Sequence, residues 1–138
     1  MSAVPKQNEK SPMTLWHATK ANTPIVAGRR EFFEYADLGV ANASNNAMQA
    51  QIMTAKRGLT EPTGWHYHVC DGQFIHVLKG WVDLEFETGE KRRISAGDSM
   101  FIPGGLRHNE TATAEELEIL EVTMPAHMGT VACERPEQ

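Results

Sequence analysis

The sequence has few of the features that mark a membrane-bound, secreted or disulfide-stabilised protein. Its 138 residues include two cysteines, Cys70 and Cys133. We interpret them as free thiols of a reducing compartment, because they can pair only if the fold brings them together. No apolar run approaches the roughly 20 residues that cross a membrane, and the opening MSAVPKQNEKSP lacks the apolar core of a signal peptide. We therefore expect a cytoplasmic protein with no membrane partner.

Positive charge is also scarce. The 13 lysine and arginine residues are outnumbered by 18 aspartate and glutamate residues, which gives a formal net charge of −5. A nucleic-acid-binding protein needs a basic surface, so we expect no nucleic-acid partner. The small basic cluster at residues 91–93 is interpreted as a solvated turn at the tip of a hairpin.

The pattern contains no convincing long helix and instead predicts many short strands. Val82, Leu84 and Phe86 alternate with acidic residues, which is the period of a half-buried strand. Residues 48–56 have helical propensity, but the dense turn signals on both sides favour a strand. Residues 112–117 are compatible with a single helical turn or a loop. The expected strands are 31–40, 48–56, 65–69, 73–78, 81–86, 92–95, 100–102 and 117–123.

Regularly spaced short strands predict an all-β sandwich or barrel. The length is suited to one domain with a sizeable core. We expect residues 1–13, which are polar, to form a flexible lead-in and residues 14–138 to form the barrel domain. The tail after Pro125 is expected to be partly frayed.

Two histidines on one expected strand are the strongest chemical signal. Residues 64–80 read GWHYHVCDGQFIHVLKG, with His66 and His68 two positions apart. Side chains at i and i+2 share a face of a strand, so both imidazoles point the same way. Packing explains such a pair poorly, whereas two ligands of one metal ion explain it well.

A second stretch ends in another histidine. Residues 97–108 read GDSMFIPGGLRH, which indicates a strand that runs into a tight Pro-Gly turn and then reaches His108. Proline fixes the backbone of this turn, and glycine permits the angles that follow it.

The two stretches resemble the two motifs of the cupin superfamily, G-x5-H-x-H-x(3,4)-E-x6-G and G-x5-P-x-G-x2-H-x3-N, over roughly residues 58–112. The resemblance implies a double-stranded β-helix, a jelly-roll-type barrel that is often dimeric, and we expect a homodimer. It also implies one divalent metal ion per chain, which would be zinc, iron, nickel or manganese. The implied metal ligands are His66, His68, Gln73 and His108.

The chain departs from these motifs at three positions. Thr60 stands in place of the first glycine, Ala112 stands in place of the final asparagine, and Gln73 stands in place of the glutamate. The change at Gln73 is chemical, because an amide ligand is neutral and leaves more net charge on a divalent ion. A bound ion would then be a stronger Lewis acid but less tightly held. The alternative is that Gln73 forms hydrogen bonds inside the barrel without binding a metal.

Strand alternation sorts the remaining candidates. If Gln73 points inward, His76 points away, so we do not expect it to bind the metal. Trp65 and Tyr67 are expected on the face opposite the histidines, and Arg107 is expected at the rim of the barrel. Alternate residues of a barrel strand face inward, which defines a possible pocket lining. These lining candidates are Gln51, Met53, Phe86, Met100, Ile102 and Ile119.

Two functions fit this sequence. The first is a metal-dependent enzyme acting on a small organic substrate, a carbonyl or enol compound or a carboxylate, by Lewis-acid or dioxygen chemistry. Both an isomerase, lyase or cyclase and a dioxygenase are compatible with the ligand set, and the sequence identifies no general base. The alternative is a barrel that binds or senses a small molecule without converting it.

Overall fold

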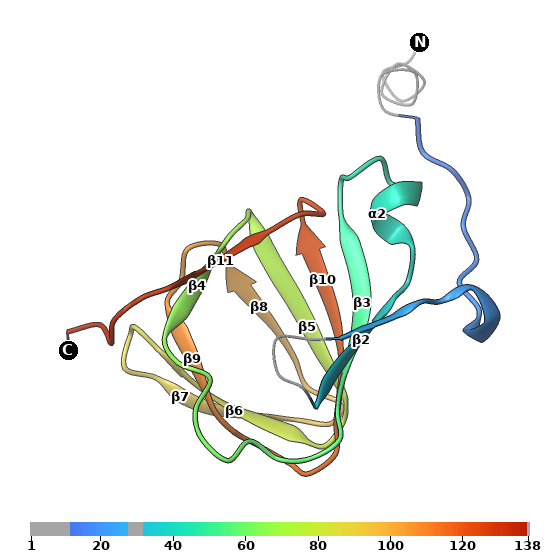
Figure 1. Cartoon of the computed structure of the whole chain (residues 1–138). Coiled ribbons are helices and arrows are strands. Elements are labelled where there is room, and N and C mark those ends of the chain that lie inside the picture. The colour runs from blue at the N-terminus through green and yellow to red at the C-terminus, as the bar shows by residue number, and fades with distance from the viewer. Residues whose placement is uncertain (1–11, 28–31, 138) are drawn as a thin grey trace.

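Two antiparallel sheets face each other and form a barrel in the computed structural model, which describes residues 12–27 and 32–137 (Figure 1). One sheet has the order β1 (Ile25–Ala27), β2 (Phe33–Asp37), β3 (Gln49–Ala55), β10 (Leu117–Met124), β5 (Gly72–Lys79) and β8 (Ser99–Pro103). The other has the order β11 (Gly129–Ala132), β4 (His66–Val69), β9 (His108–Thr113), β6 (Trp81–Phe86) and β7 (Lys91–Ser95). The predicted all-β, double-stranded β-helix fold is confirmed.

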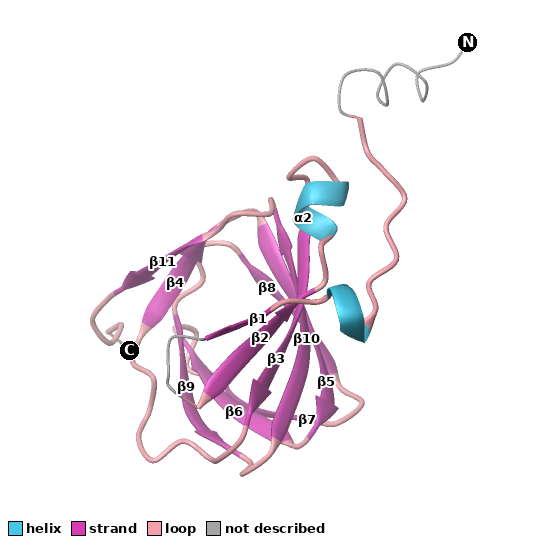
Figure 2. Ribbon diagram, turned by 45° about the vertical axis from the view of Figure 1, so that its right-hand side comes forward, coloured by secondary structure: helices cyan, strands magenta, loops and turns pink. Residues whose placement is uncertain are grey.

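Helical structure in the described chain is limited to two short elements (Figure 2). These are the 3₁₀ helix η1 (Lys20–Asn22) and the helix α2 (Val40–Ala43), which begins where the sequence predicted the end of a strand. The strand predicted at residues 48–56 is confirmed as β3. The described part of the chain holds no helix long and apolar enough to cross a membrane.

Several boundaries differ from the sequence-based prediction. The tail after Pro125 was expected to be partly frayed; its residues 129–132 form β11, which pairs with β4, and residues 133–137 belong to no helix or strand. The basic cluster at residues 91–93 lies in β7, exposed and paired with β6, and not in the turn itself. Residues 112 and 113 belong to β9, so residues 114–116 form the connection to β10. The lead-in predicted for residues 1–13 falls almost wholly outside the described residues.

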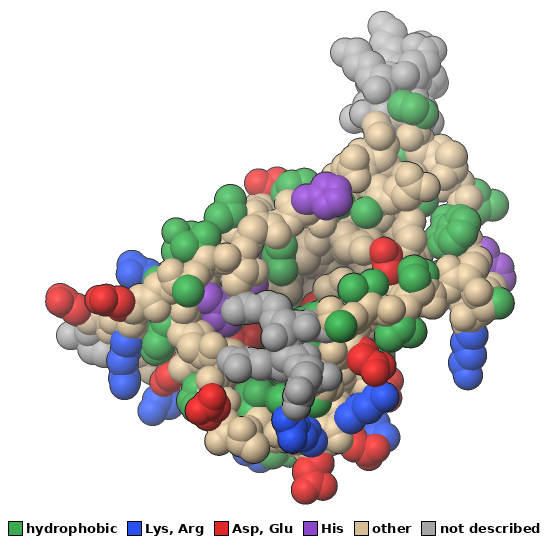
Figure 3. All heavy atoms as spheres, viewed as in Figure 1, with side chains coloured by type: hydrophobic (Ala, Val, Ile, Leu, Met, Phe, Trp, Pro, Cys, Tyr) green, Lys and Arg blue, Asp and Glu red, His purple; other side chains and the backbone are tan. Residues whose placement is uncertain are grey.

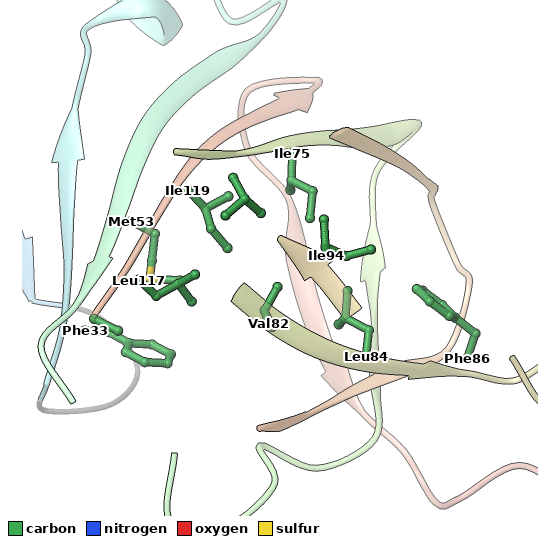
Figure 4. Packing of buried hydrophobic residues seen from close by; sticks show 11 residues of the cluster. Phe33, Met53, Ile75, Val82, Leu84, Phe86, Ile94, Leu117 and Ile119 are labelled. Atoms are coloured by element: carbon green, nitrogen blue, oxygen red, sulfur yellow. The ribbon is translucent and has the colours of Figure 1, made fainter. Parts of the chain in front are cut away.

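The core lies between the sheets and is built by strand alternation (Figure 4). In β6, Val82, Leu84 and Phe86 are buried, while the residues between them are only half-buried. Leu117 and Ile119 of β10 face them from the opposite sheet, and Leu117 is 1% exposed. Burial of such side chains stabilises the barrel by about 1.5–3 kcal/mol each. The full cluster is Phe33, Met53, Ala55, Ile75, Val77, Val82, Leu84, Phe86, Ile94, Leu117 and Ile119.

A bulge in β9 sets which of its side chains reach the interior. Leu84 pairs with Glu110 and Asp83 pairs with Ala112, so Thr111 is an extra residue without a partner position in β6. One extra residue changes the face on which the following side chains lie. His108 and Glu110 therefore point inward before the bulge, and the buried Thr113 points inward after it.

Candidate metal centre

Three histidines meet inside the barrel on neighbouring strands. His66 and His68 come from β4, and His108 comes from β9, directly opposite His66 in the strand register. Their candidate ligand nitrogens all lie within 4.8 Å of one another. All three side chains are buried, with exposed fractions of 3%, 9% and 2%. The alternation predicted for β4 thus brings both of its histidines to one face, and together the three form a potential metal site.

Each imidazole has a hydrogen-bond partner on its Nδ1 atom. The Nδ1 of His66 lies 2.7 Å from the Gly64 carbonyl oxygen, and the Nδ1 of His108 lies 2.9 Å from the Leu106 carbonyl oxygen. A carbonyl can only accept, so both Nδ1 atoms donate and both Nε2 atoms keep a free lone pair when the rings are neutral. The Nδ1 of His68 is engaged by the Thr130 hydroxyl at 3.1 Å. Metal-bound histidines are commonly oriented by such a partner on the other ring nitrogen.

Burial also favours the neutral, metal-binding form of His108. Burial is the main cause that lowers its pKa below the ordinary value of 6.5, and the neighbouring His66 lowers it further. The Leu106 carbonyl and Glu110 act in the opposite direction. A neutral imidazole is the form that coordinates a cation, so this environment suits a metal ligand.

Two glycines give the histidines their positions. Gly64 has φ +101°, a backbone angle that favours glycine, and its carbonyl accepts the hydrogen bond from His66. Gly104 lies so close to the Cys70 backbone that an added Cβ would stand 1.6 Å from the Cys70 carbonyl oxygen. The turn before β9 is thereby held against the end of β4, where Gly105 donates to the His68 carbonyl at 2.9 Å.

Gln73 belongs to the same interior. It is 6% exposed, lies on β5 of the opposite sheet and lines the same cavity as the three histidines. His76 of the same strand instead lies on the outer face, with its Nδ1 2.7 Å from the Ser99 hydroxyl oxygen. The structure therefore places Gln73 inside and His76 outside, as alternation predicts, while ligation by Gln73 stays a prediction.

The cavity next to the histidines has a volume of about 120 Å³ and a largely apolar wall. Gln51, Met53, Ile102 and Ile119, four of the six lining candidates, border it. Phe86 and Met100, the other two candidates, do not. The ring of Phe86 lies behind His108, with the ring centres 6.2 Å apart, and Met100 packs against the apolar core. Figure 3 shows the surface of the molecule in the view of Figure 1, with histidine side chains in purple and acidic side chains in red.

Two carboxyl groups in this cavity were missed by the sequence analysis. Glu110 follows His108 by two positions, and its Oε2 lies 3.4 Å from the Nε2 of His66. Glu121 continues the inward row of Leu117 and Ile119 on β10 and lines the cavity. A charged residue on the buried side of an apolar alternation is the signal that could have identified Glu121.

Glu121 has a strongly altered acidity. Burial raises its pKa from 4.5 to about 7, and the charge of Glu110 adds to this effect. The hydrogen bond from Gln51 Nε2 to Glu121 Oε1, 3.0 Å long, opposes it. The Glu121 side chain is half-buried, because it borders the cavity. Protein surrounds that cavity, so the ionised carboxylate is poorly solvated. Glu121 therefore changes protonation near neutral pH.

A double-sheet barrel with three inward histidines from two motifs defines a class of small metal-binding β-barrels. Residues 52–123 match the cupin domain family, which is about half of the chain, and the protein therefore belongs to this family. An uncharacterized protein of Aquifex aeolicus is 38% identical over 64 residues, which cover 46% of this chain and 52% of that protein. The chain thus spans about half the length of this curated relative.

Solved structures of low sequence identity share the fold. KdgF from Halomonas sp. has a TM-score of 0.67 and 21% identity over 83% of this chain and 96% of its own. The polyketide cyclase RemF from Streptomyces resistomycificus has a TM-score of 0.68 and 16% identity over 89% of this chain and 90% of its own. Hydroxypropylphosphonic acid epoxidase from S. wedmorenis has a TM-score of 0.66 and 15% identity over 83% of this chain and 62% of its own. At these identities the similarity establishes the fold alone.

Proposed function

We propose that this protein is a metal-dependent enzyme that acts on a small organic substrate, a carbonyl or enol compound or a carboxylate. The observation that supports it is the convergence of three buried histidines, each with a hydrogen-bond partner on Nδ1, where the carbonyl partners of His66 and His108 direct the Nε2 lone pairs of these two rings toward a metal. A divalent ion held there by His66, His68, His108 and Gln73 would polarise a substrate oxygen or activate dioxygen. Zinc, iron, nickel and manganese all suit this donor set.

In this proposal Glu121 is the general acid or base that transfers a proton to or from the substrate. Its carboxyl group lines the cavity, and Gln51 fixes the position of one oxygen. A carboxyl group with a pKa of about 7 is present in both protonation states near neutral pH, which suits a general acid or base. The surrounding apolar wall, including Met53, Ile102 and Ile119, would hold the body of the substrate and exclude water.

The metal content of the purified protein tests the proposal. After loading with a divalent ion and removal of the excess, elemental analysis should find one ion per chain. The double variant His66→Ala with His68→Ala should retain almost none, because two of the three clustered ligand nitrogens are lost. His76→Ala is the matched control, since this histidine lies on the outer face and should leave the content unchanged. A wild-type protein that binds no metal would exclude the proposal.

The second candidate is a barrel that binds or senses a small molecule without converting it. It is favoured by the neutral Gln73, which weakens the hold on a metal ion compared with a carboxylate. A small ketone or carboxylate that raises the melting temperature and is recovered unchanged would support binding without turnover. Conversion of the same compound would support the enzyme.

We further propose that the chain forms a homodimer and acts in the cytoplasm. The dimer is supported by apolar side chains exposed on the outer face of the six-stranded sheet, among them Phe74, Leu78 and Phe101. The cytoplasmic compartment is supported by Cys70 and Cys133, which are both free thiols.

A further inference from the structure

Glu110 is an acidic residue that lies next to the metal-facing side of His66. Its Oε2 lies 3.4 Å from the Nε2 of His66, the nitrogen that remains available once the Nδ1 atom donates to the Gly64 carbonyl. Two ligand atoms that bind one zinc ion at 2.0–2.1 Å in tetrahedral geometry are separated by about 3.3 Å. The observed separation from His66 is close to that of two ligands sharing one ion, whereas the group of ligand atoms that all lie within 4.8 Å of one another contains only the three histidines.

The carboxylate is held in this position by the chain itself. The Thr63 hydroxyl donates to Glu110 Oε2 at 2.7 Å, and the Thr63 amide donates to the Glu110 carbonyl oxygen at 2.9 Å. The adjacent Gly64 amide donates to Asn109 Oδ1 at 2.9 Å, which ties the loop before β4 to β9. The elements that carry His66 and Glu110 are thus fixed to each other. Little conformational entropy is lost when both groups bind the same ion.

The negative charge of Glu110 favours its binding to a divalent ion. Three neutral imidazoles and the Gln73 amide contribute no negative charge to a divalent ion. The related motif has a carboxylate at the position of Gln73, whereas here the carboxylate next to the cluster stands on β9. The bulge at Thr111 follows directly, and the pairing of Glu110 with Leu84 keeps its side chain on the inward face.

We propose that Glu110 is the acidic ligand of the metal centre, which takes over from β9 the charge that Gln73 does not supply from β5. This inference rests on the proposed metal-dependent function. The centre would then consist of His66, His68, His108 and the Glu110 carboxylate, with Gln73 beside it, and the Glu110 side chain would turn from His66 toward the other two histidines when the ion binds. A divalent ion bound there keeps a net charge of +1, which makes it a weaker Lewis acid than the all-neutral set would.

Zinc affinity of matched variants tests this assignment. Zinc alone is titrated against a chromophoric chelator at pH 8 with the wild type, Glu110→Gln and Glu110→Ala, and cobalt is used to record the visible spectrum of the bound ion. Both variants should bind zinc about tenfold or more weakly, and the cobalt spectrum should change because one ligand is replaced. Glu118→Gln is the matched control, since it removes a carboxyl group from the outer face of β10, which does not line the cavity, and its zinc affinity should stay near that of the wild type.

A rescue variant separates ligation from general destabilisation. Gln73→Glu in the Glu110→Gln background should restore most of the lost zinc affinity, because a carboxylate returns to the centre from the other sheet. If the wild type binds zinc and His66→Ala does not, while both Glu110 variants bind like the wild type, the assignment of Glu110 is overturned and the metal-dependent function stands. Weaker binding with an unchanged cobalt spectrum also overturns it, because Glu110 would then act through His66. A wild type that binds no zinc overturns the proposed function itself.

Discussion

At the scale of single residues, Glu121 is the group whose charge depends most on the fold. Its pKa is raised to about 7 in the folded protein, whereas the same carboxyl group has an ordinary value of 4.5 when exposed. Below pH 4.5 the carboxyl group is protonated in both the folded and the unfolded chain, and it does not lower the free energy of unfolding. Between pH 4.5 and about pH 7, the unfolded chain releases the proton and the folded chain keeps it. The folded state therefore loses stability as the pH rises through this window.

Replacing Glu121 by glutamine should remove this pH dependence. Relative to the wild type, the free energy of unfolding of Glu121→Gln should rise between pH 4.5 and pH 8, by about 1–3 kcal/mol. Urea denaturation of both metal-free proteins at several pH values measures the difference. The contribution of His108, whose lowered pKa acts with the opposite slope, is present in both proteins and largely cancels. A difference that stays constant over this range would contradict the raised pKa.

Strand alternation was sufficient to predict how the histidines are directed. It placed His66 and His68 on one face and His76 on the other, and the structure agrees. Glu110 and Glu121 share a strand face with inward residues, but both were missed because an acidic residue in a strand is usually on the solvent face. Their partners, Thr63 and Gln51, lie 47 and 70 positions away along the chain. No local pattern reports such distant contacts.

At the scale of elements, β11 has a role that the sequence did not indicate. Its pairing with β4 places Thr130 opposite His68, and the Thr130 hydroxyl lies 3.1 Å from the His68 Nδ1. The tail thus both covers one edge of the five-stranded sheet and orients one of the three clustered histidines. The tail was expected to be partly frayed, and its residues 129–132 form a strand by pairing with β4.

Removing the hydroxyl group of Thr130 should weaken metal binding. Thr130→Val keeps the shape of the side chain but leaves the His68 Nδ1 without this partner, and we expect a loss of about tenfold in zinc affinity. Thr130→Ser keeps the hydroxyl group and should bind like the wild type. Competition with a chelator measures both affinities. Equal affinity of the valine and serine variants would show that β11 does not orient His68.

The long-range pairing of elements limits what any sequence pattern can predict here. The spacing of residues 64–80 and 97–108 gives the two motifs and thereby most of the barrel, but the register of His66 opposite His108 emerges only in the folded sheet. The helix α2 was missed because four residues carry too little periodicity to separate a helical turn from a loop.

At the scale of the whole molecule, the six-stranded sheet leaves apolar side chains on its outer face. Phe74 of β5 pairs with Phe101 of β8 on one side and with Val122 of β10 on the other, so the three side chains are neighbours. Phe74, Leu78 and Phe101 are all exposed, and Phe101 is 55% exposed. Apolar side chains gathered on one face commonly mark an interface with another protein. A second copy of this chain could cover them by a two-fold axis that places each sheet against the other.

A charge introduced on the outer face of the six-stranded sheet should convert the proposed dimer to a monomer. Light scattering coupled to size-exclusion chromatography should give twice the chain mass of 15.3 kDa for the wild type. Phe101→Glu places a charge among the exposed apolar residues, and its burial against a second sheet would be costly, so this variant should elute with the mass of one chain. Leu15→Glu is the control, because Leu15 is 98% exposed and lies outside the sheet. The zinc affinity of Phe101→Glu should be unchanged, because Phe101 lies on the outer face of the six-stranded sheet, whereas the three histidines lie inside the barrel on the other sheet. A wild-type protein with the mass of a single chain would contradict the dimer, and a dimeric Phe101→Glu variant would place the interface on another face.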